Sequence, residues 1–176
     1  MAAMIEFILK TKRLVISPLK LEDAAFILDL LNEPAFIQFI GDRGVRNQED
    51  ARNYLLKGPL ASYELNGFGL WRVQVTSTGE PIGICGLIKR ESLPDIDIGY
   101  SYLARFWGQG YASEAAEAVR DYARHTLGLR RLLAITDQRN TASVRVLEKI
   151  GMRLEGLIKM PGEEEELNLF GLELDG

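Results

Sequence analysis

A strand, a glycine-bearing turn and a long helix follow one another without interruption in the middle of the chain. This segment constrains the fold more than any other. A strand is predicted over residues 96–103, and the loop after it carries Gly108 and Gly110. A helix is predicted over residues 111–126, because its apolar residues recur at the spacing of one helix face: Ala112, Ala115, Ala116, Val119, Tyr122 and Ala123. The segment therefore places a long amphipathic helix directly after a strand, with glycines at the junction.

The other elements are predicted from short apolar runs and from the residues that interrupt them. Further strands are expected over residues 14–16, 70–76, 82–89, 131–136, 152–159 and 167–174. Further helices are expected over residues 21–31, with another turn or two over 34–40, from a cap at Asn47 toward Leu60, and over 141–150. The order is strand, two helices, three strands, helix, strand, helix, two strands. It predicts a mixed α/β sheet with helices on its faces, not a regular βαβ repeat.

Composition narrows the classes of protein that the chain can belong to. Its 176 residues correspond to one domain, expected over residues 1–176, with a core large enough to need no disulfide. The net charge of −4 and the lack of a basic stripe argue against nucleic acid as a partner. No apolar run approaches the ~20 residues of a membrane span, and no signal-peptide pattern is expected. The single cysteine, Cys85, fits a reducing compartment, so we expect a cytoplasmic protein that binds no membrane.

The loop between the strand and the long helix has the chemistry of an anion site. Unpaired main-chain N–H groups gather at a helix N-terminus, where the helix dipole also favours negative charge. Glycine at positions 108 and 110 lets the backbone approach a phosphate or pyrophosphate, although glycines also serve in ordinary turns. Two familiar phosphate loops do not fit. The dinucleotide fingerprint needs a third glycine where Ser113 stands, and a P-loop needs Gly-Lys-Ser/Thr where Tyr111 and Ala112 follow Gly110.

Several segments, in the same order along the chain, resemble one family. The run Arg105-Phe-Trp-Gly-Gln-Gly110 fits the Arg/Gln-x-x-Gly-x-Gly/Ala signature of the GCN5-related N-acetyltransferases (GNAT). The longer string from Ile98-Gly-Tyr to Ser-Glu-Ala115 is similar to the ribosomal-protein-alanine N-acetyltransferase branch, which acetylates N-termini of ribosomal proteins. Residues 140–152 resemble that branch's second motif, residues 11–18 its first strand, and Ile82-Gly83 its Ile-Gly pair. The resemblance covers roughly residues 11 to 152.

The resemblance implies a mostly antiparallel central sheet, splayed at the cofactor site, and acetyl-CoA as cosubstrate with no metal. The amides of residues 108–113 would hold the coenzyme A pyrophosphate. The strand end at Tyr102-Leu103 would pair with the pantetheine amides, and an N–H near Leu103 would polarise the acetyl carbonyl. Asn140 would contact the pantetheine arm from the other side. The implied cofactor-binding residues are Tyr102, Leu103, Arg105, Gly108, Gln109, Gly110, Tyr111, Ala112, Ser113 and Asn140.

The implied reaction is the attack of a neutral amine on a thioester, so one group must take the amine proton and another must serve the departing thiolate. Many family members use a tyrosine seven residues after the second-motif asparagine, but Leu147 stands there. Ser143 matches the serine that serves the thiolate in the ribosomal-protein branch; a helix-surface or capping role is the alternative. Asp97 matches a strand acid of the family and would act as base through a water. Its alternative is an exposed carboxylate at a strand edge.

Other residues with reactive side chains are either weaker candidates for the base or are expected to have structural roles. Asp95, Asp137 and Glu155 are weaker candidates for the base. His125, the only histidine, is predicted in the last turn of a helix, where a cation complements the dipole. Cys85 is interpreted as a buried small apolar residue, because the sequence shows no base beside it. Trp71 is expected in the core, and the ring of Trp107 either walls the loop or packs.

The acceptor is left open by the sequence. Residues 36–40 and the loop Gly41–Gly44 occupy the region that shapes the acceptor pocket in the family. The run Glu163–Glu166 is interpreted as a solvated turn, with attraction of a cationic substrate as the alternative. We expect transfer of acetyl to a primary amine, either a protein N-terminus or a small amine, by a monomer or homodimer. The alternatives are a weakly active acyl-CoA-binding sensor and an antibiotic or polyamine acetyltransferase.

Overall fold

The structure is a computed structural model that describes residues 7–174. Over these residues the strands are β1 (Leu9–Lys10), β2 (Leu14–Ser17), β3 (Leu70–Val75), β4 (Pro81–Ile88), β5 (Asp97–Tyr102), β6 (Arg131–Thr136), β7 (Arg153–Lys159) and β8 (Glu166–Glu173). The helices are α1 (Ala24–Leu31), α2 (Pro34–Phe39), α3 (Gln48–Lys57), α4 (Pro59–Asn66), α5 (Tyr111–His125) and α6 (Thr141–Lys149), with 3-10 turns η1 (Leu21–Asp23) and η2 (Ala104–Phe106). No helix within residues 7–174 has the length and apolar character needed to cross a membrane.

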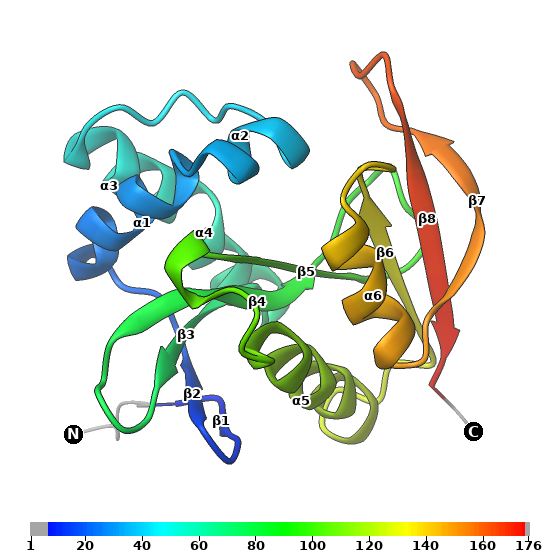
Figure 1. The fold of residues 1–176 in the computed structure, drawn as a ribbon, viewed down its shortest axis with the longest axis horizontal. Coiled ribbons are helices and arrows are strands. Elements are labelled where there is room, and N and C mark those ends of the chain that lie inside the picture. The colour runs from blue at the N-terminus through cyan, green and yellow to red at the C-terminus, as the bar shows by residue number, and fades with distance from the viewer. Residues whose placement is uncertain (1–6, 175–176) are drawn as a thin grey trace.

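All of these strands join one sheet in the order β1-β2-β3-β4-β5-β6-β8-β7. Neighbouring strands are antiparallel, except that β5 and β6 are parallel and meet at a single register position, where Asp97 lies opposite Leu133. Beyond that position the two strands diverge, and Figure 1 shows them running in different directions. The predicted fold class, a mixed and mostly antiparallel sheet that is splayed between two strands, is confirmed.

Helices cover both faces of the sheet, as predicted (Figure 1). On one face, α5 and α6 contribute Val119 and Leu147 to the larger hydrophobic cluster. On the other face, α1 and α3 contribute Ile27 and Leu55 to a second cluster. Burying an aliphatic side chain of this size stabilises the fold by roughly 1.5–3 kcal/mol, so the two clusters hold the helices against the sheet.

Strand β5 contributes to both clusters, because successive side chains of a strand point to opposite faces. Ile98 and Tyr102 belong to the cluster beneath α5, whereas Leu103 belongs to the cluster beneath α1 and α3. By the same alternation, Tyr100 faces α5 and α6, and Asp97 faces α1 and α3. The splayed strand therefore presents different side chains to the two faces of the sheet.

The segment after Asn47 differs from the prediction of one helix running toward Leu60. Helix α3 ends at Lys57, and the separate helix α4 begins at Pro59. The break lies at Gly58, and a proline at the first position of a helix starts a new helix because its missing N–H is not needed there. Asn47 caps α3 as predicted, accepting a hydrogen bond from the amide of Asp50.

Candidate active site

The divergence of β5 from β6 leaves main-chain groups of β5 without a strand partner. The amide of Leu103 donates to the carbonyl of Ile82 at 2.9 Å, so the odd-numbered residues of β5 direct their main-chain groups toward β4. The even-numbered residues direct theirs toward β6, but pairing with β6 stops at the level of Leu133. The amides of Tyr100 and Tyr102 therefore face the opening unpaired, and such groups require a ligand or water when they are buried.

The N–H expected near Leu103 to polarise the acetyl carbonyl is not that of Leu103 itself. The Leu103 amide is bonded to Ile82, and the side chain is buried in the cluster beneath α1 and α3. The ladder with β4 continues past the end of β5, so the neighbouring amide that faces the opening is that of Tyr102, and its role stays a prediction. Tyr102 does lie at the opening, where its carbonyl accepts a hydrogen bond from Nε1 of Trp107 at 2.9 Å. The Trp107 side chain is exposed at the loop, not packed in the core.

The loop between η2 and α5, residues 107–110, depends on two glycines with left-handed backbone conformation, and we call it the glycine loop. Gly108 has φ +75°, and Gly110, the N-cap residue of α5, has φ +83°. Residues with a Cβ rarely adopt these angles. No atom lies within 4 Å of the position that a Cβ would take at Gly108, so backbone conformation, not crowding by the protein, requires glycine there.

This loop presents a run of free main-chain donors. The first hydrogen bond of α5 runs from the amide of Glu114 to the carbonyl of Gly110 at 3.1 Å. No hydrogen bond found among residues 7–174 starts from the amides of residues 108–113. Those N–H groups lie at the positive end of a helix of 15 residues, where a diphosphate is favoured by both hydrogen bonding and the helix dipole.

The other residues predicted around this loop occupy different positions. Ala112 and Ser113 form the first turn of α5 and are half-buried. Arg105 lies in η2 with an exposed side chain, and its Nη2 is 3.8 Å from Oε1 of Glu80. The carbonyl of Gln109 and the ring of Tyr111 contact a residue that the sequence had not suggested, Arg13.

Ser143 is ordered by residues on both sides of the opening. Asn140 is the N-cap residue of α6, and its Oδ1 accepts from the amide of Ser143 at 3.2 Å. The hydroxyl of Tyr100, on β5, lies 2.9 Å from Oγ of Ser143 and donates to the Ser143 carbonyl at 3.0 Å. The helix cap is therefore Asn140, while the Ser143 side chain faces the splayed strand. Tyr100 was missed as a site residue, although it lies within the Ile98-Gly-Tyr string.

Leu147 lies in the cluster beneath α5, and its side chain is fully buried. A leucine there contributes to the core and offers no proton. The hydroxyl groups near the opening therefore come from Ser143 on α6 and from Tyr100 on β5.

Asp97 lies at the closed end of the opening and on the sheet face covered by α1 and α3. Only 1% of its surface is exposed, so the alternative of an exposed strand-edge carboxylate is wrong, because β6 continues the sheet beside it. Nε of Arg90 donates to its two oxygens at 3.1 and 3.3 Å. Burial raises the pKa of Asp97 to about 6, although the positive charge of Arg90 opposes the shift.

The weaker carboxylate candidates are all engaged by arginines. Asp95 lies 3.6 Å from Arg131, which also binds Glu155. Asp137 binds Arg139 at 3.0 Å, and hydrogen bonds from that side chain lower the pKa of Asp137. A lowered pKa disfavours proton acceptance at neutral pH, so Asp137 is poorly suited as a base. The contacts of Asp95 and Glu155 with Arg131 are structural.

The remaining residues with reactive side chains have structural environments. Cys85 is fully buried, so the prediction of a buried small residue is confirmed, and burial raises the pKa of its thiol to about 12. Trp71 lies in the core, edge-on to Tyr122 with ring centroids 5.4 Å apart, also as predicted. His125 is exposed in the last turn of α5. Within residues 7–174, no three His, Cys, Asp or Glu side chains are grouped to hold a metal ion.

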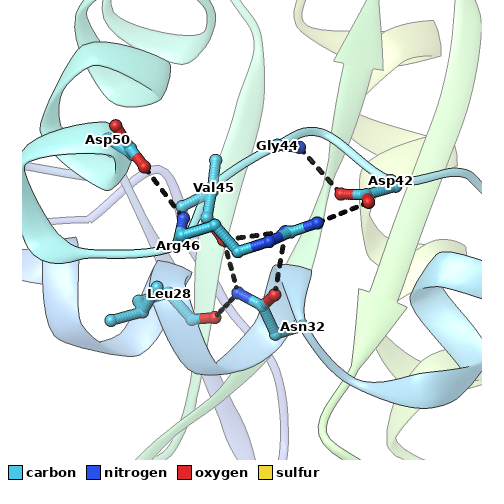
Figure 2. Close-up of polar contacts among 7 residues, drawn as sticks. All are labelled: Leu28, Asn32, Asp42, Gly44, Val45, Arg46 and Asp50. Atoms are coloured by element: carbon cyan, nitrogen blue, oxygen red, sulfur yellow. Dashed lines mark hydrogen bonds and ion pairs between the residues drawn. The ribbon is translucent and has the colours of Figure 1, made fainter.

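The loop of residues 41–46, which we call the acceptor-side loop, connects α2 to α3 and is held by a small polar network (Figure 2). Nδ2 of Asn32 donates to the carbonyls of Leu28 and Val45 at 2.7 and 2.8 Å. Asp42 accepts from the amide of Gly44 at 2.8 Å and forms an ion pair with Arg46 at 2.5 Å. The network fixes the path of the loop with contacts among residues at most 14 positions apart.

The sequence matches the family model described as an acetyltransferase (GNAT) domain over residues 13–153, which is most of the chain. The chain therefore belongs to the GNAT acetyltransferase family, the class that the resemblance predicted.

Relatives and solved structures agree with this assignment. YkkB of Bacillus subtilis, whose name records no function, is 32% identical over 86% of this chain and 88% of its own. An acetyltransferase from Agrobacterium tumefaciens has a TM-score of 0.80 and 28% identity, covering 98% of this chain and 97% of its own. RimL, a ribosomal L7/L12 alpha-N-protein acetyltransferase solved with coenzyme A, has a TM-score of 0.80 over 94% and 96% of the two chains. At 18% identity, the likeness to RimL shows the fold alone.

Proposed function

We propose that this protein transfers the acetyl group of acetyl-CoA to a primary amine by direct attack in a ternary complex. The observation that carries the proposal is the run of free amides over residues 108–113, close to the unpaired main-chain groups of β5. The first set fits a diphosphate, and the second fits an extended arm that carries amides. Coenzyme A has these two parts in that order, and RimL, which has this fold, is described in complex with coenzyme A.

In this arrangement, the pyrophosphate binds at residues 108–113, and the pantetheine arm pairs with the amides of Tyr100 and Tyr102. The Oδ1 of Asn140 is used by the Ser143 amide, so its Nδ2 is the group available to the arm. We assign the polarisation of the acetyl carbonyl to an amide of the even-numbered residues of β5, next to Leu103, because these amides face the opening.

Ser143 then serves the departing thiolate. The Tyr100 hydroxyl has one hydrogen, and when that hydrogen points to Oγ of Ser143 instead of the Ser143 carbonyl, the hydrogen of the Ser143 hydroxyl is left for the sulfur. This division of donors supplies the acid function that Leu147 cannot. General acid–base assistance of this kind contributes about 10²–10⁴ in rate.

Asp97 takes the amine proton, through a water, from the opposite face of the sheet. Its carboxyl lies on the face of α1 and α3, whereas Ser143 lies on the face of α5 and α6. The amine therefore approaches the thioester from one face while the thiolate leaves toward the other. With a pKa raised to about 6, Asp97 is mostly ionised at neutral pH and still basic enough to accept a proton.

A protein N-terminus is the first candidate for the acceptor. The branch resemblance supports it, and so does the acidic turn between β7 and β8, which attracts an ammonium group. Gln138 donates to the Glu166 carbonyl at 2.8 Å, which ties that turn to the loop before Asn140. A hollow of about 420 Å³ beside α3 is lined by Arg43 and Lys57 as well as Asp50, a balance that disfavours a polycationic acceptor.

An acceptor screen with the purified protein tests the proposal. Thiol release from acetyl-CoA is measured with peptides of different N-terminal residues, with polyamines and with aminoglycosides. We expect peptides with a free N-terminus to give the highest kcat/KM and N-blocked peptides to give none. Preference for a polyamine or aminoglycoside would overturn the acceptor assignment. Stabilisation by acetyl-CoA without turnover of any acceptor would instead indicate a sensor.

A further inference from the structure

A side chain from the beginning of the described chain reaches the glycine loop. Arg13 precedes Gln109 by 96 positions, yet its Nη1 donates to the Gln109 carbonyl at 2.9 Å. Its guanidinium lies over the ring of Tyr111, 4.4 Å from the centroid. Its Nη2 is 3.3 Å from the position that a Cβ would take at Gly110. One guanidinium therefore contacts Gln109 and the first residue of α5, and it lies beside the Gly110 between them.

Arg13 is itself held by Glu114 in the first turn of α5. Nε of Arg13 donates to Oε1 of Glu114 at 2.7 Å, and the Arg13 amide donates to Oε2 at 2.9 Å. The hydroxyl of Thr11 also donates to Oε2. Burial raises the pKa of Glu114, but these hydrogen bonds outweigh burial and lower it overall. The carboxylate stays ionised and the two charges compensate, so Arg13 acts through geometry more than through net charge.

The Gln109 carbonyl is the contact with the clearest consequence for a ligand. In a trans peptide, the carbonyl of residue 109 and the N–H of residue 110 point in opposite directions. Holding that carbonyl on Arg13 therefore turns the Gly110 N–H away from Arg13. The peptide is flanked by Gly108 and Gly110, whose backbones are permissive, so without an anchor it can rotate and present its oxygen to an anion.

We propose that Arg13 is a positioning residue for acetyl-CoA, which fixes the Gln109–Gly110 peptide so that the loop offers donors to the diphosphate. The inference rests on the proposed cofactor site. Arg13 touches the loop and not the reacting atoms, so its contribution belongs to the diphosphate end of the ligand. The thioester and its pantetheine arm bind independently of it.

Calorimetry with two ligands tests this inference. Acetyl-CoA carries the diphosphate, and S-acetylpantetheine carries the same thioester and arm without it. Arg13→Ala is expected to raise the dissociation constant of acetyl-CoA about tenfold, as expected for losing one hydrogen bond to a charged group, and to leave that of S-acetylpantetheine unchanged. Arg13→Lys is expected to recover little, because an ammonium cannot bridge Glu114 and Gln109 as the planar fork does.

Arg120→Ala is the matched control, since Arg120 lies on α5, the helix that carries Glu114, and binds Asp121 and the Ile150 carbonyl away from the glycine loop. We expect it to change neither dissociation constant. If Arg13→Ala does not fold, Glu114→Gln gives the same readout with a smaller rise. Equal weakening of both ligands, or unchanged acetyl-CoA binding, overturns the role of Arg13. Failure of the unmodified protein to bind acetyl-CoA overturns the cofactor site itself, so the two failures are distinguishable.

Discussion

The loop before α5 and the acceptor-side loop are held in different ways. The glycine loop is fixed by Arg13 and Glu114, a pair that joins segments far apart in sequence and whose carboxylate is largely shielded. The acceptor-side loop is fixed mainly among near neighbours, and its ion pair between Asp42 and Arg46 is about half exposed on both sides. Exposed ion pairs stabilise a fold little, because water and salt screen them. We infer that the glycine loop is part of the rigid frame, whereas the acceptor-side loop can change at small cost to the fold.

The largest effect is expected from a side chain in the glycine loop. Gly110→Val forces a β-branched residue to φ +83° and directs its Cβ at Arg13. Backbone strain of about 3 kcal/mol, or displacement of the loop to relieve it, weakens acetyl-CoA binding at least about a hundredfold. The measurement is the dissociation constant of acetyl-CoA.

Gly128→Val is the matched control for this change. Gly128 also has positive φ but, unlike Gly110, has open space where a Cβ would lie, and it lies beyond the other end of α5. We expect a similar loss of thermal stability with unchanged affinity for acetyl-CoA. Equal loss of affinity in both variants would mean that backbone strain at either end of α5 is sufficient to weaken acetyl-CoA binding. The glycine loop would then have no special role in binding.

The second-largest effect is expected at Ser143, where a substitution should lower kcat without weakening acetyl-CoA binding. Ser143→Ala removes the hydroxyl proposed to serve the thiolate, so kcat is expected to fall about a hundredfold while the affinity for acetyl-CoA changes little. Tyr100→Phe removes only the partner of that hydroxyl and is expected to lower kcat about tenfold. Both values come from steady-state kinetics with the best acceptor. An unchanged kcat in Ser143→Ala would take the acid role away from Ser143.

A pH-dependent effect is expected at Asp97. In the unmodified protein, kcat/KM should rise through pH 6 as the carboxyl ionises, and Asp97→Asn should lose this rise with about a tenfold or larger drop at pH 7. The ionisation of Asp97 has the opposite effect on the free energy of unfolding. The pKa is higher in the folded than in the unfolded chain, so ionisation costs stability as the pH rises from about 4 to 6.

Thermal denaturation across the same pH range checks that sign. Asp97→Asn should remove the decline in stability, because its amide does not ionise. A profile of kcat/KM that keeps its acidic limb in Asp97→Asn would assign the base to another group or to water alone.

The smallest effect is expected in the acceptor-side loop. Asp42→Ala removes the ion pair with Arg46 and the hydrogen bond to the Gly44 amide, both at the surface (Figure 2). We expect the KM of the acceptor to change by about threefold, in line with the small worth of exposed pairs, with no change in acetyl-CoA affinity. A loss of acetyl-CoA binding would show that the two loops are coupled.

The sequence predicted most of the fold, because its local signals agree with the tertiary structure. The amphipathic run of α5 and the cap at Asn47 required no long-range information. The break at Gly58–Pro59 was missed, although the proline is a helix-start signal, because the apolar residues continue through it.

The site could be predicted only in part. The position of the glycine loop follows from its motif, whereas the contacts of Arg13 with that loop and of Tyr100 with Ser143 join segments distant in sequence. Which of the N–H groups near Leu103 faces the opening could not be predicted, because the alternation of main-chain groups along β5 depends on its register with β4. Register of this kind is set by strand pairing, which one strand alone does not reveal.

A crystal structure of the protein with coenzyme A tests the central claim most directly. The account predicts phosphate oxygens within hydrogen-bonding distance of amides between Gly108 and Ser113, with the Gln109 carbonyl still on Arg13 and the pantetheine arm beside Tyr100. A diphosphate bound elsewhere, with these amides facing only water, would contradict it.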